Sequence, residues 1–191
     1  NIRATMVEAL AANQRNFLDF ADGHLGSGFV LATLVGLEAQ YPELRLDEKL
    51  TPAGRALADV FRDSCQVPFY FATPFVPQGV LFTDGTRPAH RPEFQDVFRE
   101  NTLGLNNPGN DPGLRPPGRV LVSSCVADDS FMVVTPAEDS RELVRSYRAQ
   151  GVDVRYHGLN CGNDVLITDP YRWATELFGM HTVSWLMEEI R

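Results

Sequence analysis

Acidic and imidazole side chains follow the two strands predicted for the second half of the chain. Asp128 and Asp129 come shortly after an apolar strand over residues 119–123, and His157 comes directly after an alternating strand over residues 152–156. A carboxylate that accepts a hydrogen bond from an imidazole holds one tautomer and stabilises the charged ring, so the imidazole can take a proton from a serine. The spacing therefore predicts the acid and base of an acyl-transfer site. His181, in the predicted last helix, is the other candidate base.

The serine nucleophile of such a site is missing from the sequence. No G-x-S-x-G pattern occurs, and Gly26-Ser27-Gly28 lacks the preceding strand that a nucleophile elbow requires. Because the chain begins at Asn1 and not at Met, we expect that an upstream segment has been removed.

The elements around the candidate residues alternate between strand and helix. Apolar spacing predicts the strands at 119–123 and 152–156, a helix over 136–150 between them and a closing helix over 173–190. Two strands joined by a helix form a parallel βαβ unit, and ligands bind beyond the carboxyl ends of such strands. Upstream, helices are expected over 2–21, 29–40 and 51–63. A proline-rich stretch with one short helix over 93–100 follows them.

Composition excludes several classes of partner. With 17 Lys and Arg against 25 Asp and Glu, the net charge is −8, which argues against a nucleic-acid footprint. The longest apolar run, over residues 29–37, is too short to span a membrane. Cys65, Cys125 and Cys161 lack zinc-ligand spacing, and we expect neither a metal nor another cofactor. An oxidising compartment would leave one thiol free or bonded to another chain, whereas a reducing one would leave three buried thiols.

Each candidate residue also has a purely structural interpretation. Asp128 and Asp129 fit a solvated turn, His157 fits a surface loop, and His181 fits a partly buried position on its helix. Asp164 and Asp169 fit loop acids or helix N-caps. The sequence leaves both interpretations open.

Two groups of residues carry a family resemblance. The first runs from Asp22-Gly23-His24-Leu25-Gly26-Ser27-Gly28 through Tyr41-Pro42 and Gly54 to Cys65-Gln66-Val67-Pro68. The second comprises residues 119–122 and 136–151, Glu176-Leu177-Phe178-Gly179 and Trp185-Leu186. In this order they resemble the C-terminal half of the secretory lipase family typified by Candida antarctica lipase A, in the α/β-hydrolase superfamily. The resemblance implies an α/β fold with a helical cap or insert over 1–75, a loop and short-helix crossover over 76–118 and the last βαβα of the hydrolase sheet over 119–191.

The resemblance implies that this is the C-terminal portion of a secreted serine ester hydrolase, extracellular or in the cell envelope, acting on fatty-acid esters. It would supply the acid, Asp128 or Asp129, the histidine, His157 or His181, and the acyl-binding cap. An N-terminal segment or chain, lying upstream and carrying the nucleophile serine, would be its partner, linked through Cys65. Cys125 and Cys161 would bridge the two site loops.

Two departures from the family pattern motivate an alternative function. Counting back from Pro136 puts Met132 in the family's acid position, and counting back from residues 176–179 puts Arg172 in its histidine position. The alternative is a catalytically inactive hydrolase fold that binds an apolar ligand or a partner chain.

Overall fold

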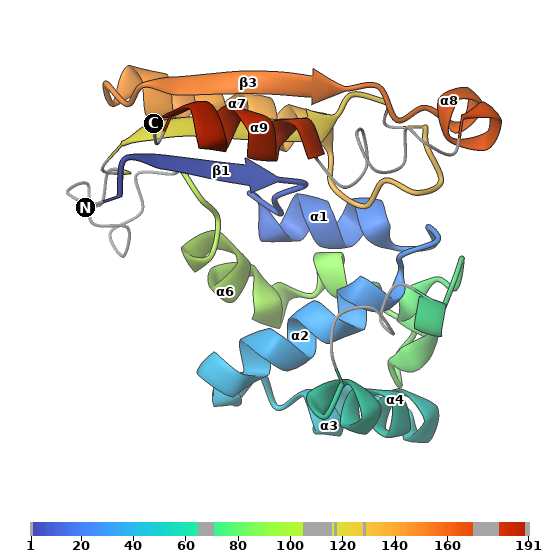
Figure 1. Ribbon diagram of the computed structural model, residues 1–191. Coiled ribbons are helices and arrows are strands. Elements are labelled where there is room, and N and C mark those ends of the chain that lie inside the picture. The colour runs from blue at the N-terminus through green and yellow to red at the C-terminus, as the bar shows by residue number, and fades with distance from the viewer. Residues whose placement is uncertain are drawn as a thin grey trace. The chain divides into compact units, whose positions relative to one another are not determined.

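The structure is a computed structural model that describes residues 2–64, 71–104, 116, 118–127, 129–169 and 180–189. The chain forms two compact units. The first, here called the sheet unit, combines residues 1–13 with residues 102–191, and the second, the helical unit, spans residues 14–101 (Figure 1). The compact units divide at residues 13 and 101. The roles predicted above for segments 1–75, 76–118 and 119–191 stay a prediction.

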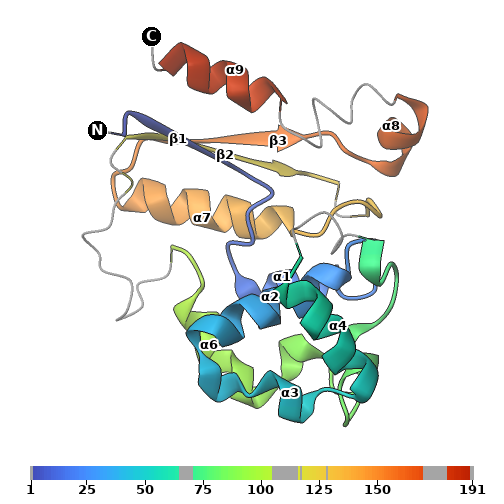
Figure 2. The same ribbon diagram turned by 60° about the horizontal axis from the view of Figure 1, so that its bottom comes forward.

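Three parallel strands form the sheet unit. They are β1 (Ala4–Glu8), β2 (Arg119–Cys125) and β3 (Val154–Leu159), in the order β1-β2-β3. Helix α7 (Ala137–Ala149) connects β2 to β3, which confirms the predicted βαβ unit. Helix α9 (Met180–Glu189) contacts β1, and the two views place α7 and α9 on opposite faces of the sheet (Figures 1 and 2).

Alternation along the strands sorts their side chains between the two helices. Val120 and Val122 of β2 pack with Val144 of α7 and Val154 of β3 in a buried core cluster. On the same face, the hydroxyls of Ser124 and Tyr156 lie 2.9 Å apart, within hydrogen-bonding distance. The other positions of the strands therefore face the α9 side.

The prediction of a helix over residues 2–21 is wrong for its first part. Residues Ala4–Glu8 form β1, and helix α1 begins only at Gln14 and ends at Ala21. The helical spacing of Met6, Leu10 and Phe17 was coincidental. Pairing of Ala4–Glu8 with Arg119–Ser123, far along the chain, decides the conformation of this segment.

Short helices make up the helical unit. After α1 come α2 (Gly28–Gln40), a 3₁₀ turn (Pro42–Leu44), α3 (Leu46–Lys49) and α4 (Pro52–Arg62). Three further 3₁₀ turns (Gln78–Leu81, Pro88–His90 and Pro92–Phe94) lead into α6 (Gln95–Glu100). Thr51 caps the start of α4, because its hydroxyl accepts a hydrogen bond from the Gly54 amide at 3.1 Å.

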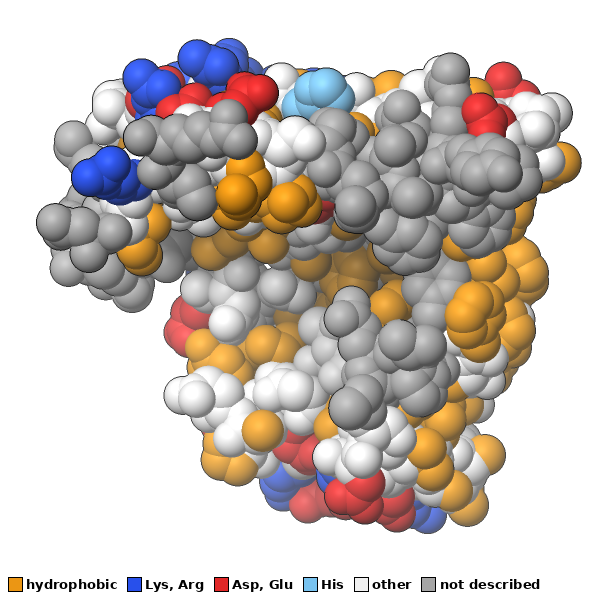
Figure 3. Space-filling model, viewed as in Figure 1, with side chains coloured by type: hydrophobic (Ala, Val, Ile, Leu, Met, Phe, Trp, Pro, Cys, Tyr) orange, Lys and Arg blue, Asp and Glu red, His pale blue; other side chains and the backbone are white. Residues whose placement is uncertain are grey.

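Fully buried leucines and phenylalanines hold this unit together, among them Leu18, Leu31, Leu34, Phe94 and Phe98. On its surface, acidic and basic side chains gather over α3 and α4 (Figure 3). Arg62 there bonds Asp59 at 2.6 Å, Asp47 at 2.8 Å and Glu38 at 3.0 Å.

Candidate functional site

The loops that follow β2 and β3 start side by side. Cys125, the last residue of β2, is in register with Leu159, the last residue of β3. The Val126 amide then donates a hydrogen bond to the Leu159 carbonyl at 2.9 Å, which continues the pairing past the strand. Because both strands are parallel, the acid loop (residues 126–131) and the loop that leads into α8 (Asn163–Thr168) share the carboxyl edge of the sheet.

A disulfide joins the end of β2, where the acid loop begins, to the loop that leads into α8. Cys125 bonds Cys161, with their Cα atoms 5.7 Å apart, and both residues are buried. This confirms the bridge that the resemblance implied. The predicted linkage of Cys65 to another chain concerns a residue outside the described part of the structure, and stays a prediction.

Asn163, the first residue of α8, connects the same loops by hydrogen bonds. Its Oδ1 accepts a hydrogen bond from the Phe131 amide at 2.9 Å, and its Nδ2 donates to the Asp129 carbonyl at 3.0 Å. Both ends of one side-chain amide are therefore used on the acid loop. Sequence reasoning missed this residue, because an asparagine in a polar loop gives no signal of where its amide points.

Close packing at Gly158 brings the loops still nearer. A Cβ atom added to this residue would lie 2.6 Å from Cγ1 of Val126, closer than real Cβ contacts come. A side chain at this position would therefore require the exposed Val126 side chain to move. The φ of Gly158 is not positive, so the close approach and not the backbone conformation favours glycine here.

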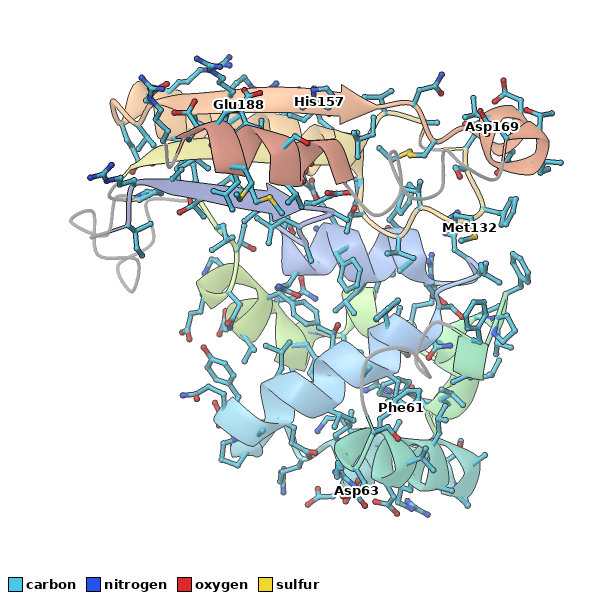
Figure 4. All side chains as sticks on the ribbon, viewed as in Figure 1. Phe61, Asp63, Met132, His157, Asp169 and Glu188 are labelled. Carbon is cyan, nitrogen blue, oxygen red and sulfur yellow. A yellow bond between two sulfur atoms is a disulfide. The ribbon has the colours of Figure 1, made fainter. Side chains whose placement is uncertain are left out.

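The predicted acid residues lie in the acid loop. Asp129 is exposed, four residues after the end of β2, and its backbone is held by Asn163. Asp128 lies outside the described residues. Met132, which one count placed in the family's acid position, is buried and belongs to the packed interior. Figure 4 shows Met132 and Asp169 beyond the carboxyl end of β3.

The predicted histidines are placed differently from one another. His157 is exposed and lies within β3, two residues before the strand ends, and not after it as predicted (Figure 4). The cause is the strand boundary, since β3 covers Val154–Leu159 and not residues 152–156. His157 is in register with Ser123, which is in register with Glu8, so these three positions form one row on the α9 side of the sheet.

His181 lies in the first turn of α9, and nothing is described of its side chain. Its neighbour Thr182 is buried and donates a hydrogen bond from its hydroxyl to Oε2 of Glu8 at 3.3 Å. Glu8 ends β1, so the backbone of His181 starts its helix near the carboxyl edge of the sheet. Arg172, which one count placed in the family's histidine position, lies outside the described residues.

Within the ranges that the structure describes, no three His, Cys, Asp or Glu side chains are grouped as metal ligands would be. No helix of those ranges is long and apolar enough to cross a membrane.

Known proteins of similar sequence or structure show which fold this architecture resembles. No protein-family model matches the sequence, and no curated protein matches it. Among solved structures, the X-ray structure of Candida antarctica lipase A matches with a TM-score of 0.67 at 17% identity, over 83% of this chain and 36% of that one. The same lipase in its closed state matches with a TM-score of 0.64, with the same identity and coverage. The chain has a lipase-like fold.

The lipase-like fold accounts for the elements described above. The parallel three-stranded sheet with its helices is consistent with part of an α/β-hydrolase fold, as predicted. The chain spans about a third of the length of lipase A, given the 36% coverage. At this identity the likeness concerns the fold, and the chemistry of the site has to be argued from the residues of this chain.

Proposed function

We propose that this chain is the C-terminal portion of a secreted serine ester hydrolase and that Asp129 is the acid of its catalytic triad. The observation that carries the proposal is the set of contacts that hold the acid loop in place. A disulfide, a backbone hydrogen bond and the Asn163 amide all hold this loop at the carboxyl edge of a parallel sheet with a lipase-like fold. These contacts hold the loop at the edge where the acid of an α/β-hydrolase triad would lie.

The proposed reaction needs groups from this chain and from an upstream segment. That segment would supply a serine whose Oγ attacks the ester carbonyl, while a histidine of this chain, His181 or His157, takes the serine proton. The alcohol would leave with that proton, and a water activated by the same imidazole would then release the acid. Asp129 would hold the imidazole in the required tautomer. The helical unit and the proline-rich loops would bind the acyl chain of a fatty-acid ester.

Features of the sheet unit support an upstream partner segment. In the sheet of the described residues, β1 is a terminal strand, paired only with β2, and its five residues are all partly buried. Val183 and Met187, four residues apart on α9, are 43% and 50% exposed. A free strand edge and exposed apolar side chains are features that further strands and helices of a hydrolase would cover.

The proposed location is extracellular or in the cell envelope. The buried disulfide between Cys125 and Cys161 supports it, because such bonds persist mainly in oxidising compartments.

The position of His157 favours a second candidate, an inactive hydrolase fold that binds an apolar ligand or a partner chain. A histidine inside a strand has less freedom to meet a loop carboxylate than one in the loop that follows. In this candidate the acid loop would be a remnant of the ancestral site.

The experiment is ester hydrolysis by natively purified protein, with Asp129→Asn as the test variant and Asp164→Asn, an exposed acid in the first turn of α8, as its control. A loss of turnover of about 10⁴-fold, as measured for triads that lose their acid, with KM little changed, is expected for Asp129→Asn alone. Equal turnover of the two variants would remove Asp129 from the mechanism. Absence of hydrolysis and of serine labelling by a fluorophosphonate in the native protein would favour the inactive fold.

The partner is tested by intact mass of the same preparation with and without reductant. A second species released only by reductant would identify a chain linked through Cys65. A single species matching 21.3 kDa in both runs would exclude a covalent partner.

A further inference from the structure

We propose that Asn163 is a positioning residue that fixes the backbone from which the Asp129 side chain projects. This inference rests on the proposed function of Asp129 and adds the residue that controls its placement. Asn163 belongs to the loop after β3, so the position of the acid depends on a side chain from the neighbouring strand's connection.

The acid loop has separate ties at its two ends. Its entry is fixed by Cys125, bonded to Cys161, and by the Val126 amide bonded to the Leu159 carbonyl. Asp129 lies further along, in a turn in which the Ser130 amide donates a hydrogen bond to the Ala127 carbonyl at 3.0 Å. Asn163 binds the Asp129 carbonyl and the Phe131 amide, which ties this turn to α8 on both sides of Ser130.

The chemistry of the amide matches this task. The Phe131 N–H needs an acceptor and the Asp129 carbonyl needs a donor, and an asparagine offers one of each on a single planar group. The Asp129 backbone is then held, and the freedom of its carboxylate is reduced to rotation about the side-chain bonds. Ser130, between the two bonded groups, is fully buried.

Substitutions of Asn163 can remove both of its hydrogen bonds to the acid loop or only one of them. Asn163→Ala removes both partners from the acid loop. Asn163→Asp keeps an acceptor for the Phe131 amide but places a carboxylate oxygen against the Asp129 carbonyl, which repels it. The control is Thr168→Ala, which removes a 2.6 Å hydrogen bond from the Thr168 hydroxyl to the Asp164 carbonyl inside the same helix, without touching the acid loop.

Two measurements on the intact protein test the inference. The first is amide hydrogen exchange at Phe131, which needs no catalysis. Exchange should rise about fivefold or more in Asn163→Ala, as expected for the loss of about one hydrogen bond, and should stay near the wild-type rate in Asn163→Asp and Thr168→Ala. Equal protection of Phe131 in Asn163→Ala and wild type would overturn the inference.

The second measurement is steady-state hydrolysis of a 4-nitrophenyl ester. Both Asn163 variants should lose about tenfold or more in kcat with KM little changed, because a misplaced acid affects the transition state and not substrate binding. Thr168→Ala should keep the wild-type kcat. A kcat unchanged in Asn163→Asp, or reduced as much in Thr168→Ala, would overturn the positioning role. If wild-type protein hydrolyses no ester while Phe131 exchange responds as expected, the proposed function fails and the structural tie remains.

Discussion

The hydroxyl of Thr182 on α9 donates a hydrogen bond to the carboxylate of Glu8 at the end of β1, with the two oxygens 3.3 Å apart. The two residues are 174 positions apart, so this contact joins the last described helix to the first strand. It lies at the carboxyl edge, beside the backbone of His181. The start of α9 is therefore anchored at the edge where the acid loop lies.

We expect Thr182→Val to weaken this anchor. Valine keeps the shape of the buried side chain but removes the donor to Glu8, so the free energy of unfolding should fall by about 1.5–3 kcal/mol, the range for hydrogen bonds to charged groups. Urea unfolding followed by circular dichroism measures the change. Ser184→Ala, at an exposed position of the same helix, is the control and should change stability by less than about 0.5 kcal/mol. Similar values for both variants would show that the bond contributes nothing.

Substitution of Arg91 should destabilise the helical unit. Its guanidinium is 5% exposed, bonds Asp84 at 2.5 Å and Glu93 at 2.7 Å, and lies 4.4 Å from the ring centroid of Phe82. Lysine cannot bond two carboxylates in one plane and stack on a ring. Arg91→Lys should therefore lower the free energy of unfolding by about 2 kcal/mol.

The control for Arg91→Lys is Arg99→Lys, because Arg99 pairs with Asp96 on an exposed helix face. Exposed pairs contribute little, so this variant should be close to wild type. Thermal unfolding of both variants by calorimetry compares them directly. A melting temperature of Arg91→Lys equal to that of Arg99→Lys would contradict the role assigned to the buried guanidinium.

Removal of the disulfide should destabilise the sheet unit. The bond closes a loop with a sequence separation of 36, for which the chain-entropy relation gives about 3–4 kcal/mol. The double variant Cys125→Ala/Cys161→Ala should lose about this amount in urea unfolding. Peptide mapping without reductant should find the two cysteines in one linked peptide. A map that links either of them to Cys65 instead would show a different pairing.

Tyr147 on α7 should make the sheet unit sensitive to alkaline pH. Burial raises the pKa of Tyr147 above its ordinary value of 10.0, since desolvation disfavours the phenolate. The folded state then holds the proton more tightly than the unfolded state, so its contribution to stability is complete below pH 10 and is lost as the pH rises through the folded-state pKa.

The test is the pH dependence of unfolding in wild type and Tyr147→Phe. Both should have similar stability near pH 7, and above pH 10 the wild type should lose stability more steeply, by at most about 1.4 kcal/mol per pH unit for one proton. Parallel curves above pH 10 would mean that Tyr147 titrates alike in the folded and unfolded states.

Much of the sheet unit could be predicted from the sequence, because its signals are local. The alternation in β3 and the apolar run in β2 frame a helix with clear spacing, and these patterns are sufficient for a βαβ unit. The strand β1 was missed because its five residues continue, by chance, the apolar spacing of α1. Its conformation depends on pairing with β2, which no local pattern reveals.

The candidate site, too, could be predicted from the sequence only where the signals are local. The sequence placed Asp129 correctly after a strand, since topology alone brings loops to the carboxyl edge. It misplaced His157 because the predicted strand end lay three residues too early, which is enough to move a side chain from a loop into a strand. The tie from Asn163 could not be read at all, because it depends on the path of two loops that meet only in the folded protein.

The helical unit leaves the sheet unit and returns to it at one place. The Leu103 amide donates a hydrogen bond to the Ala12 carbonyl at 2.8 Å, just outside the two ends of residues 14–101. A segment whose ends are adjacent can be lengthened, shortened or exchanged without a change in the register of β1 and β2. This fold is therefore suited to modular evolution, in which a new insert brings a new specificity to an unchanged sheet.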